Sequence, residues 1–291
     1  MAITMRPSRC YLNGAFVPLD EARVPVLDRG FIFGDGVYEV IPAYARLPFR
    51  LDEHLARLGR SLRAVGMDDP MDRSQWSALV ERLLADNDPD DQCIYIQVTR
   101  GVAKRDHAFP ENTMATVFAY SFPFPHAPLR LRQGGASAVT LPDMRWLSAH
   151  IKSISLLGSV LARQASAEVG AQETILIRDG WLTEASSSNV WIVRHGQLLS
   201  PPMDNLKLEG IRVALMDELA AAVGVALHRR PVAEWELRCA DEILLTSATK
   251  EVLAVTLLDD RPVGAGSPGQ VYAALYAAYQ LAKTPAEQPS S

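Results

Sequence analysis

Lysine is scarce in this chain, and one lysine stands where an amine could take part in chemistry. Lys152 lies between the end of an apolar strand and a helix of small and apolar residues, in HIKSISLLGSVLARQ. An arginine stays protonated, whereas a desolvated lysine can lose its proton and attack a carbonyl carbon. A solvated lysine near a helix start is the ordinary interpretation, so other residues must decide. Of the 29 basic residues, five are lysines: Lys104, Lys152, Lys207, Lys250 and Lys283.

A concentration of polar groups begins at Glu184, in the stretch WLTEASSSNV. A carboxylate, three hydroxyls and an amide stand there between two apolar strands. A solvated turn would explain them. An acid that partners a protonated ring nitrogen would explain them too, and the serine cluster would then supply supporting hydrogen bonds.

Arginine and histidine side chains offer possible contacts to anions. Arg105 and His107 stand in the loop KRDHAFPEN, where Arg can bind a carboxylate through two hydrogen bonds and His can donate another. Arg57 follows His54 by one helical turn, so it need not point to solvent. The stretch GIRV at 210–213 opens a helix after a glycine, and the N–H groups of a helix start attract anions.

A lysine, a distant glutamate, an arginine and a phosphate-type helix start together suggest pyridoxal phosphate. This cofactor needs a lysine that holds it covalently, a partner for its pyridine nitrogen and donors for its phosphate. The chain has no GxGxxG after a strand and no GxxxxGK[ST], so a Rossmann or P-loop site is not indicated.

Composition narrows the class of protein further. The chain has 291 residues, of which 48% are hydrophobic and 22% charged, as in soluble globular proteins of one large or two ordinary domains. Its net charge of −5, without a basic cluster, argues against a nucleic-acid surface. Three widely spaced cysteines suit the reducing cytoplasm. No apolar run reaches membrane length, and the histidines have no metal-ligand spacing. We therefore expect a cytoplasmic protein without a metal, a membrane or a nucleic-acid partner.

The elements that must position these residues alternate between strands and helices. Asn13-Gly14 predicts a hairpin, and DRGFIFGDGVYEV predicts a tight glycine loop that feeds a strand through Tyr38. A leucine stripe from Leu55 to Leu62 predicts an amphipathic helix. These patterns indicate a fold of the α/β class in which α and β elements are mixed (α+β). We expect two domains with a ligand cleft between them.

The proline- and glycine-rich stretch FPFPHAPLRLRQGG is the best candidate for a linker. We expect an N-terminal α+β domain over residues 1–120 and a linker over 121–135. A C-terminal α/β domain over 136–285 would then carry Lys152, and residues 286–291 would form a disordered tail.

Six stretches in this order resemble the fold-type IV pyridoxal-phosphate transaminases, also called class IV aminotransferases. They are DRGFIFGDGVYEV, HLARL, IYIQVTRGVAKRDHAFPEN, DMRWLSAHIKSISLLGSVLA, ILIRDGWLTEASSSNV and TSATKEV. Within that group the chain is most similar to bacterial D-amino-acid transaminases, from about residue 10 to 280. The resemblance implies a two-domain architecture with the active site at the domain interface and pyridoxal 5'-phosphate as the cofactor.

The resemblance also implies a role for each matched residue. Lys152 stands where the family holds the cofactor covalently and is the expected catalytic residue. Glu184 stands where the family pairs the pyridine nitrogen. Arg57 matches the phosphate-binding arginine, and Leu208 matches the apolar residue that packs on the cofactor ring.

The expected trap for the substrate α-carboxylate decides the subgroup. Tyr38, Arg105 and His107 match this trap, and in the subgroup Arg105 and His107 come from the partner subunit, which implies a homodimer. L-branched-chain transaminases tend to have Y-x-R where this chain reads YIQ at 95–97. Because enzymes of this fold use one cofactor face, the side that binds the carboxylate selects the enantiomer.

The implied activity is amino transfer between a D-amino acid such as D-alanine and a 2-oxo acid, 2-oxoglutarate or pyruvate, by a ping-pong mechanism. The alternatives are an L-branched-chain-amino-acid transaminase and an (R)-amine transaminase of the same fold. An aminodeoxychorismate lyase or a non-catalytic cofactor-binding protein ranks behind them.

Two departures from the family pattern fall at the phosphate end. The family usually reads G-I-T-R where this chain has GIRV, so Arg212 replaces a threonine. A second expected hydroxyl appears as Ala248, between Ser247 and Thr249. Backbone N–H groups can still donate at these positions. The expected cofactor contacts are therefore Lys152, Glu184, Arg57, Leu208, Ile211, Arg212, Ser247 and Ala248.

Overall fold

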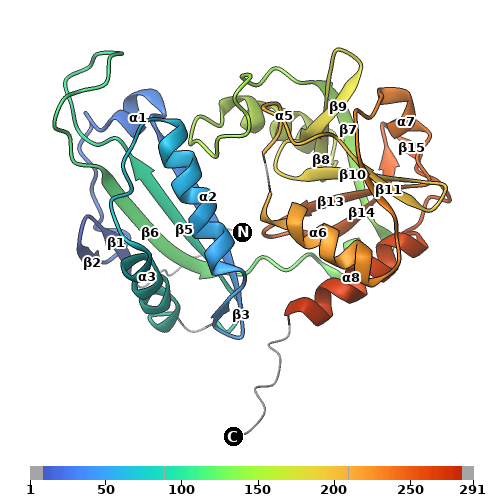
Figure 1. The fold of residues 1–291 in the computed structure, drawn as a ribbon, viewed down its shortest axis with the longest axis horizontal. Helices are drawn as coiled ribbons and strands as arrows, with labels where there is room; N and C mark the ends of the chain where they lie inside the picture. Colours follow the sequence, from blue (N-terminus) through green and yellow to red (C-terminus); the bar gives the residue numbers. More distant parts are fainter. Residues whose placement is uncertain (1–8, 88, 209, 284–291) are drawn as a thin grey trace, which may run out of the picture. The chain divides into compact units, whose positions relative to one another are not determined.

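The computed structural model of the chain consists of two compact units. It describes residues 9–87, 89–208 and 210–283, apart from the side chain of Arg212. The first unit comprises Met1–Pro125 and Ile151–Leu156, and the second comprises His126–His150 and Leu157–Ser291. Each unit has a sheet with helices of its own (Figure 1). A mixed α/β fold with two sheets is confirmed.

The first unit is built on an antiparallel sheet with the strand order β2-β1-β6-β5-β3-β4. The long pairing of β3 with β5 runs in register from Gly36 opposite Thr99 to Ala43 opposite Gln92. The strands are β1 (Cys10–Leu12), β2 (Ala15–Val17), β3 (Gly36–Tyr44), β4 (Leu47–Pro48), β5 (Gln92–Thr99) and β6 (Thr116–Pro123). The helices are α1 (Arg29–Phe33), α2 (Leu51–Ala64) and α3 (Arg73–Ala85).

Two local predictions in this unit have different outcomes. The hairpin is confirmed, with Asn13 and Gly14 at φ values of +48° and +96° between β1 and β2. The glycine loop is wrong in part, because residues 29–33 form the short helix α1. Asp28 caps this helix by accepting from the Gly30 N–H at 2.8 Å, and Gly34 ends it in the left-handed region.

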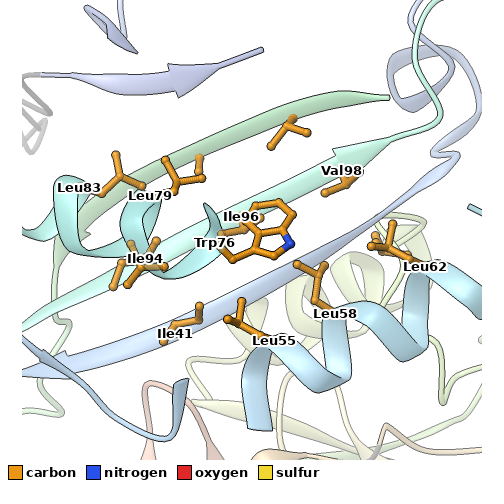
Figure 2. Packing of buried hydrophobic residues seen from close by; sticks show 14 of the residues in the cluster. Ile41, Leu55, Leu58, Leu62, Trp76, Leu79, Leu83, Ile94, Ile96 and Val98 are labelled. Carbon is orange, nitrogen blue, oxygen red and sulfur yellow. The ribbon is translucent and has the colours of Figure 1, made fainter. Parts of the chain in front are cut away.

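The core of the first unit lies between its sheet and the helices α2 and α3 (Figure 2). The predicted stripe on α2 buries Leu55, Leu58 and Leu62. Trp76 of α3 packs into the same cluster with Ile41 and the other inward-facing strand residues. Side chains two apart on a strand share one face, so β3 turns Val37, Ile41 and Ala43 toward this core, with the charged Glu39 between the first two.

The second unit has a mixed sheet with the strand order β12-β11-β10-β13-β14-β7-β8-β9, and β15 pairs with β14. Parallel pairs join β7 to β8 and to β14, and β11 to β12. Its strands are β7 (Ala136–Pro142), β8 (Glu173–Arg178), β9 (Trp181–Ala185), β10 (Asn189–Arg194), β11 (Gln197–Ser200), β12 (Leu227–Arg229), β13 (Glu242–Ser247), β14 (Glu251–Leu258) and β15 (Arg261–Pro262). Its helices are α4 (Leu129–Gly134), α5 (Leu157–Glu168), α6 (Ile211–Ala222), α7 (Glu234–Arg238) and α8 (Gln270–Lys283).

The segment that carries Lys152 groups with the first unit, whereas the expected boundaries placed it in the C-terminal domain. Main-chain hydrogen bonds explain the difference: the Tyr38 N–H donates to the Lys152 carbonyl oxygen, and the Ile154 N–H to that of Gly36, each at 3.0 Å. Strand β6 and helix α4 occupy much of the expected linker at 121–135. The expected tail at 286–291 lies outside the described residues.

Three general features bear on the class of protein. None of the helices in the described ranges is both long and apolar enough to cross a membrane. The same ranges contain no cluster of three or more His, Cys, Asp or Glu side chains that could hold a metal ion. All three cysteines are free thiols.

Candidate active site

Lys152 lies beside Tyr38 in the first unit. Its ammonium nitrogen is 4.1 Å from the centroid of the Tyr38 ring, a cation–π distance. The Lys152 backbone N–H donates to the Ser61 hydroxyl on α2 at 3.3 Å. The lysine side chain is half-buried, so its amine is held against a strand rather than extended freely into solvent. Lys152 and Tyr38, which are far apart in the sequence, are therefore in contact.

Arg57 is buried on α2, where it pairs with Glu39 of β3. Its Nη2 and Nε donate to the two carboxylate oxygens at 2.6 and 2.9 Å, and His54 Nδ1 lies 3.0 Å from Oε1. Burial opposes ionisation of Glu39, but the charges and hydrogen bonds of Arg57 and His54 outweigh it and hold its pKa well below the usual range. This arrangement fixes the Arg57 guanidinium relative to the sheet.

Glu39 was not selected from the sequence, although a signal was present. It stands between Val37 and Ile41 on a strand, and all three side chains are completely buried. A carboxylate at an inward position of a strand requires a buried cation. The position of Glu39 in VYEVI therefore indicated that a buried cation, such as Arg57, would face its carboxylate.

Arg105 and His107 are both exposed, on the loop between β5 and β6. The Arg105 guanidinium carbon lies 5.5 Å from the centroid of the Phe33 ring, and the His107 ring lies at the same distance from it. The two side chains thus share one neighbour, the Phe33 ring. They could contact one carboxylate together.

Gln97, in the YIQ stretch where an arginine was expected for an L-branched-chain enzyme, is a neutral side chain. Gln97 of β5 pairs directly with Tyr38 of β3. The Tyr95 hydroxyl donates to Gln97 Oε1 at 2.8 Å, and the Tyr38 and Tyr95 rings stack with centroids 5.8 Å apart. Gln97 can accept or donate hydrogen bonds but cannot neutralise a carboxylate.

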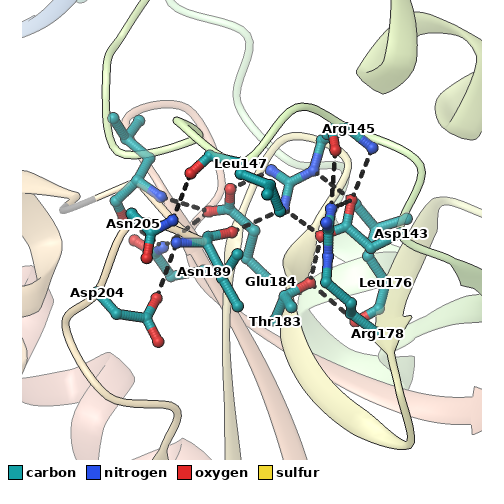
Figure 3. Close-up of polar contacts among 12 residues, drawn as sticks. Asp143, Arg145, Leu147, Leu176, Arg178, Thr183, Glu184, Asn189, Asp204 and Asn205 are labelled. Carbon is teal, nitrogen blue, oxygen red and sulfur yellow. Dashed lines mark hydrogen bonds and ion pairs between the residues drawn. The ribbon is translucent and has the colours of Figure 1, made fainter.

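Glu184 is buried at the end of β9 in the second unit, with 5% of its surface exposed. Arg145 Nη1 donates to one carboxylate oxygen, and Asn189 Nδ2 and the Leu208 N–H donate to the other at 3.3 and 3.2 Å (Figure 3). Burial raises the pKa of Glu184 to about 7, although Arg145 and the Leu208 N–H oppose this rise. Its protonation state is therefore sensitive to a nearby charge.

Arg145 is the central cation of this region, although no role was predicted for it from the sequence. Its Nε and Nη2 donate to the two oxygens of Asp143 at 2.9 and 2.8 Å, and Nη2 also donates to the Leu206 carbonyl at 3.1 Å (Figure 3). Burial of Asp143 is outweighed by Arg145 and Thr183, which lower the Asp143 pKa to about 2. The D-x-R pattern in PDMRW was the available signal.

The expectation that the serine cluster supports Glu184 is wrong. The hydroxyls of Ser186, Ser187 and Ser188 donate instead to Glu173 at the start of β8. The chain reverses there, with the Ala185 N–H bonded to the Ser188 carbonyl oxygen at 2.8 Å. This tight turn carries the hydroxyls away from Glu184.

Lys250 completes the cluster around Glu173. Its ammonium donates to a Glu173 oxygen and to the Ser187 hydroxyl at 2.8 Å, and to the Ser188 hydroxyl at 2.9 Å. Burial of Glu173 is outweighed mainly by the Lys250 charge, so the pKa of Glu173 is lowered. The Lys250–Glu173 ion pair thereby connects the turn after β13 to the turn that contains Ser186–Ser188.

Apart from Arg57, the expected phosphate residues lie at two turns of the second unit. Gly210 caps α6, and a Cβ built on it would lie 2.2 Å from the Asn189 amide oxygen, so no larger residue fits there without a shift. Ile211 is buried at the first position of α6. Ser247 ends β13, its hydroxyl accepting from the Lys250 N–H at 3.0 Å, and Ala248 follows. The Arg212 side chain lies outside the described part.

Residues 36–258 match the family model described as amino-transferase class IV. A D-alanine aminotransferase of Bacillus licheniformis is 40% identical over 257 residues, which cover 88% of this chain and 90% of that protein. A D-alanine aminotransferase of Staphylococcus aureus strain MW2 is 35% identical, with 90% and 93% covered.

Solved structures show the same fold. A branched-chain amino acid aminotransferase of T.th. with pyridoxamine 5'-phosphate has a TM-score of 0.89 and 26% identity, covering 98% of this chain and 96% of that one. The branched-chain enzyme from Escherichia coli has a TM-score of 0.85 at 22% identity, with 94% and 93% covered. These likenesses show an aminotransferase fold. The chain belongs to the class IV aminotransferase family.

Proposed function

We propose that this chain is a pyridoxal-phosphate-dependent D-amino-acid transaminase. It moves an amino group between a D-amino acid, such as D-alanine, and 2-oxoglutarate or pyruvate by a ping-pong mechanism. The names of the Bacillus and Staphylococcus relatives support the substrate class. The observation that carries the proposal is the buried Glu184 carboxylate, held by Arg145 and the Leu208 N–H.

The residues present suit pyridoxal 5'-phosphate. Glu184 supplies the buried anion that a protonated pyridine nitrogen requires, and Lys152 supplies the amine. Gly210 precedes α6 and is tightly packed against Asn189, so no side chain fits at this position. The start of α6 therefore offers backbone N–H groups to an anion. When bound, the cofactor takes up the electron pair released at the substrate Cα. Phosphate donors would come from Arg57, Ile211, Arg212, Ser247 and Ala248, with Leu208 packing on the ring.

Lys152 would move the proton in this reaction. Its amine would take the proton from the substrate Cα and return it, as a positioned general base does. Contact with the Tyr38 ring limits the positions that this amine can adopt. Glu184 would keep the ring nitrogen protonated, and a positive charge there would lower the raised Glu184 pKa.

The proposed preference for D-substrates depends on which side chains can bind the substrate α-carboxylate. Arg105 and His107 share the Phe33 ring and can bind a carboxylate together, with Tyr38 as the third member of the trap. Gln97 opposite Tyr38 offers no charge on the β5 side. The structural likeness to branched-chain enzymes keeps an L-branched-chain transaminase as the second candidate.

The proposal includes a homodimer in which Arg105 and His107 serve the partner's site. The loop that bears them and the adjacent α1 expose large apolar side chains, with Phe31 at 76% and Met114 at 88% exposure. Exposed apolar surface of this kind is typical of protein interfaces. Exposed apolar residues also line the second unit at Met144, Trp146, Leu147, Leu157, Val160 and Leu161.

A substrate panel tests the proposed activity. The purified protein with added pyridoxal phosphate is given D-Ala, D-Glu, D-Asp or L-Leu together with 2-oxoglutarate, and each 2-oxo acid product is measured. We expect turnover with D-substrates and a yellow protein that a D-amino acid bleaches without an acceptor. Faster turnover of L-Leu would identify the branched-chain alternative. Continued release of pyruvate without an acceptor, beyond one equivalent per protein, would identify a lyase.

A further inference from the structure

One buried guanidinium holds the backbone of the loop that carries Arg105 and His107. Arg29, at the start of α1, is 3% exposed. Its Nη1 donates to the Asp106 carbonyl oxygen at 2.6 Å and to that of Ala108 at 3.3 Å, and its Nη2 to that of His107 at 3.4 Å. Three consecutive carbonyl groups therefore face one cation, which requires the loop to curve around it.

A shared carboxylate fixes Arg29 in turn. Asp35 accepts from Arg29 Nε at 2.7 Å and from Arg100 Nε and Nη2 at 2.8 and 3.1 Å. Burial of Asp35 is outweighed by these two arginines, so its pKa is lowered and it carries charge. Arg100 also lies over the Phe109 ring at 3.7 Å. We call Arg29, Asp35 and Arg100 the loop clamp, because it contacts residues 106–109 from two sides.

The side chains of Arg105 and His107 are not part of this clamp. While the carbonyl groups of the loop face Arg29, the Arg105 and His107 side chains are exposed and lie beside Phe33. Arg29 lies over the same Phe33 ring at 4.9 Å. The backbone anchors thus determine where both side chains begin. An arginine that is already oriented loses less freedom when it binds a carboxylate.

We propose that Arg29 is a positioning residue that sets the affinity for the substrate α-carboxylate by holding the backbone of residues 106–108. This inference rests on the proposed function, because it needs Arg105 and His107 to be the carboxylate trap. Arg29 touches neither the reacting atoms nor the substrate. Its effect appears in binding rather than in proton transfer.

The test compares the holoenzyme with Arg29→Lys, which keeps the charge but loses the planar fork. Bleaching by D-alanine is followed over a range of concentrations. We expect the half-saturating concentration to rise about tenfold, as for the loss of one charge-assisted hydrogen bond, while the limiting rate changes by less than about threefold. Hydroxylamine, which has no carboxylate, should bleach both proteins at the same rate. Arg82→Lys, on the exposed face of α3, is the control and should match the wild type.

Hydrogen exchange supplies a readout that does not depend on activity. The amides of residues 106–109 should exchange faster in Arg29→Lys than in the wild type. In Arg82→Lys they should exchange at the wild-type rate. Should Arg29→Lys not fold, Asp106→Ala replaces it, since this exposed side chain accepts from the Ala108 N–H at 3.1 Å within the same loop. The proposal fails if D-alanine affinity is unchanged, or if the limiting rate and the hydroxylamine rate fall in parallel with it.

Arg105→Ala separates failure of this inference from failure of the proposed function. If Arg105→Ala weakens D-alanine binding and Arg29→Lys does not, the trap stands and the positioning role is overturned. If neither variant weakens binding, the trap assignment itself is wrong and the inference falls with it. If both weaken binding and only Arg29→Lys speeds loop exchange, the positioning role is supported.

Discussion

The ammonium of Lys152 lies 4.1 Å from the centroid of the Tyr38 ring, and the Tyr38 backbone N–H donates to the Lys152 carbonyl oxygen at 3.0 Å. The reactive side chain and its neighbour are therefore fixed by the same pair of backbone segments. A change in either residue alters the position of an amine that is expected to act within hydrogen-bond reach of its target.

Replacement of Lys152 by alanine should abolish amino transfer. We expect turnover to fall by at least about 10³-fold, because both the covalent anchor and the proton-transfer group are lost. Added pyridoxal phosphate should give no absorption band of a protein-linked cofactor. Lys283→Ala, outside the proposed site, should retain both the band and turnover. Wild-type turnover by Lys152→Ala would contradict the assignment.

Glu184 should make the cofactor-free protein less stable as the pH rises. Its pKa is about 7 in the folded chain and 4.5 ordinarily, so the folded state binds more protons between these values. The free energy of unfolding therefore declines from pH 4.5 to 7 and levels off above, by up to about 3 kcal/mol from this group. Urea unfolding of Glu184→Gln should lack this decline. An equal decline in the free energy of unfolding of Glu184→Gln would show that other groups cause the pH dependence.

Glu39→Gln should strongly destabilise the first unit. The change removes the carboxylate that Arg57 and His54 share, and loss of one partner of a buried pair costs about 3–5 kcal/mol. Urea unfolding measures this loss. Because the Glu39 pKa is lowered, its contribution is present above pH 4.5 and is lost as the pH falls below that value.

The control for Glu39 is Glu53→Gln, which removes a partly exposed partner of Arg50 at the start of α2. An exposed ion pair contributes about 1 kcal/mol or less, so this variant should unfold close to the wild type. Equal losses in the two variants would mean that the burial of Glu39 is not what matters.

Lys250 and Glu173 should be energetically coupled. Lys250→Met leaves the buried Glu173 with neutral donors alone, the serine hydroxyls and the Thr174 N–H, which should cost about 3 kcal/mol, whereas Ser187→Ala should cost about 1 kcal/mol. The double variant Lys250→Met, Glu173→Gln should recover part of the loss, because the unpaired charge is gone. Thermal unfolding measures these three variants and Glu173→Gln alone, which completes the double-mutant cycle. Additive losses in the double variant would exclude coupling.

Much of the local structure and the family could be predicted from the sequence. Asn13-Gly14 specified a hairpin, and the leucine spacing from Leu55 to Leu62 specified the buried face of α2. These features depend on neighbours a few residues apart, so they are encoded locally. The ordered motifs around Lys152 and Glu184 likewise indicated the family that the comparisons show.

Tertiary structure alone decided which partner each charged side chain meets. Strand register places Glu39 against Arg57, and a turn directs Ser186–Ser188 to Glu173 instead of Glu184. Backbone pairing with β3 assigns residues 151–156 to the first unit, and Arg29 meets carbonyl groups far along the chain. Such contacts depend on how distant strands and loops come together, which residue type and short-range spacing do not encode.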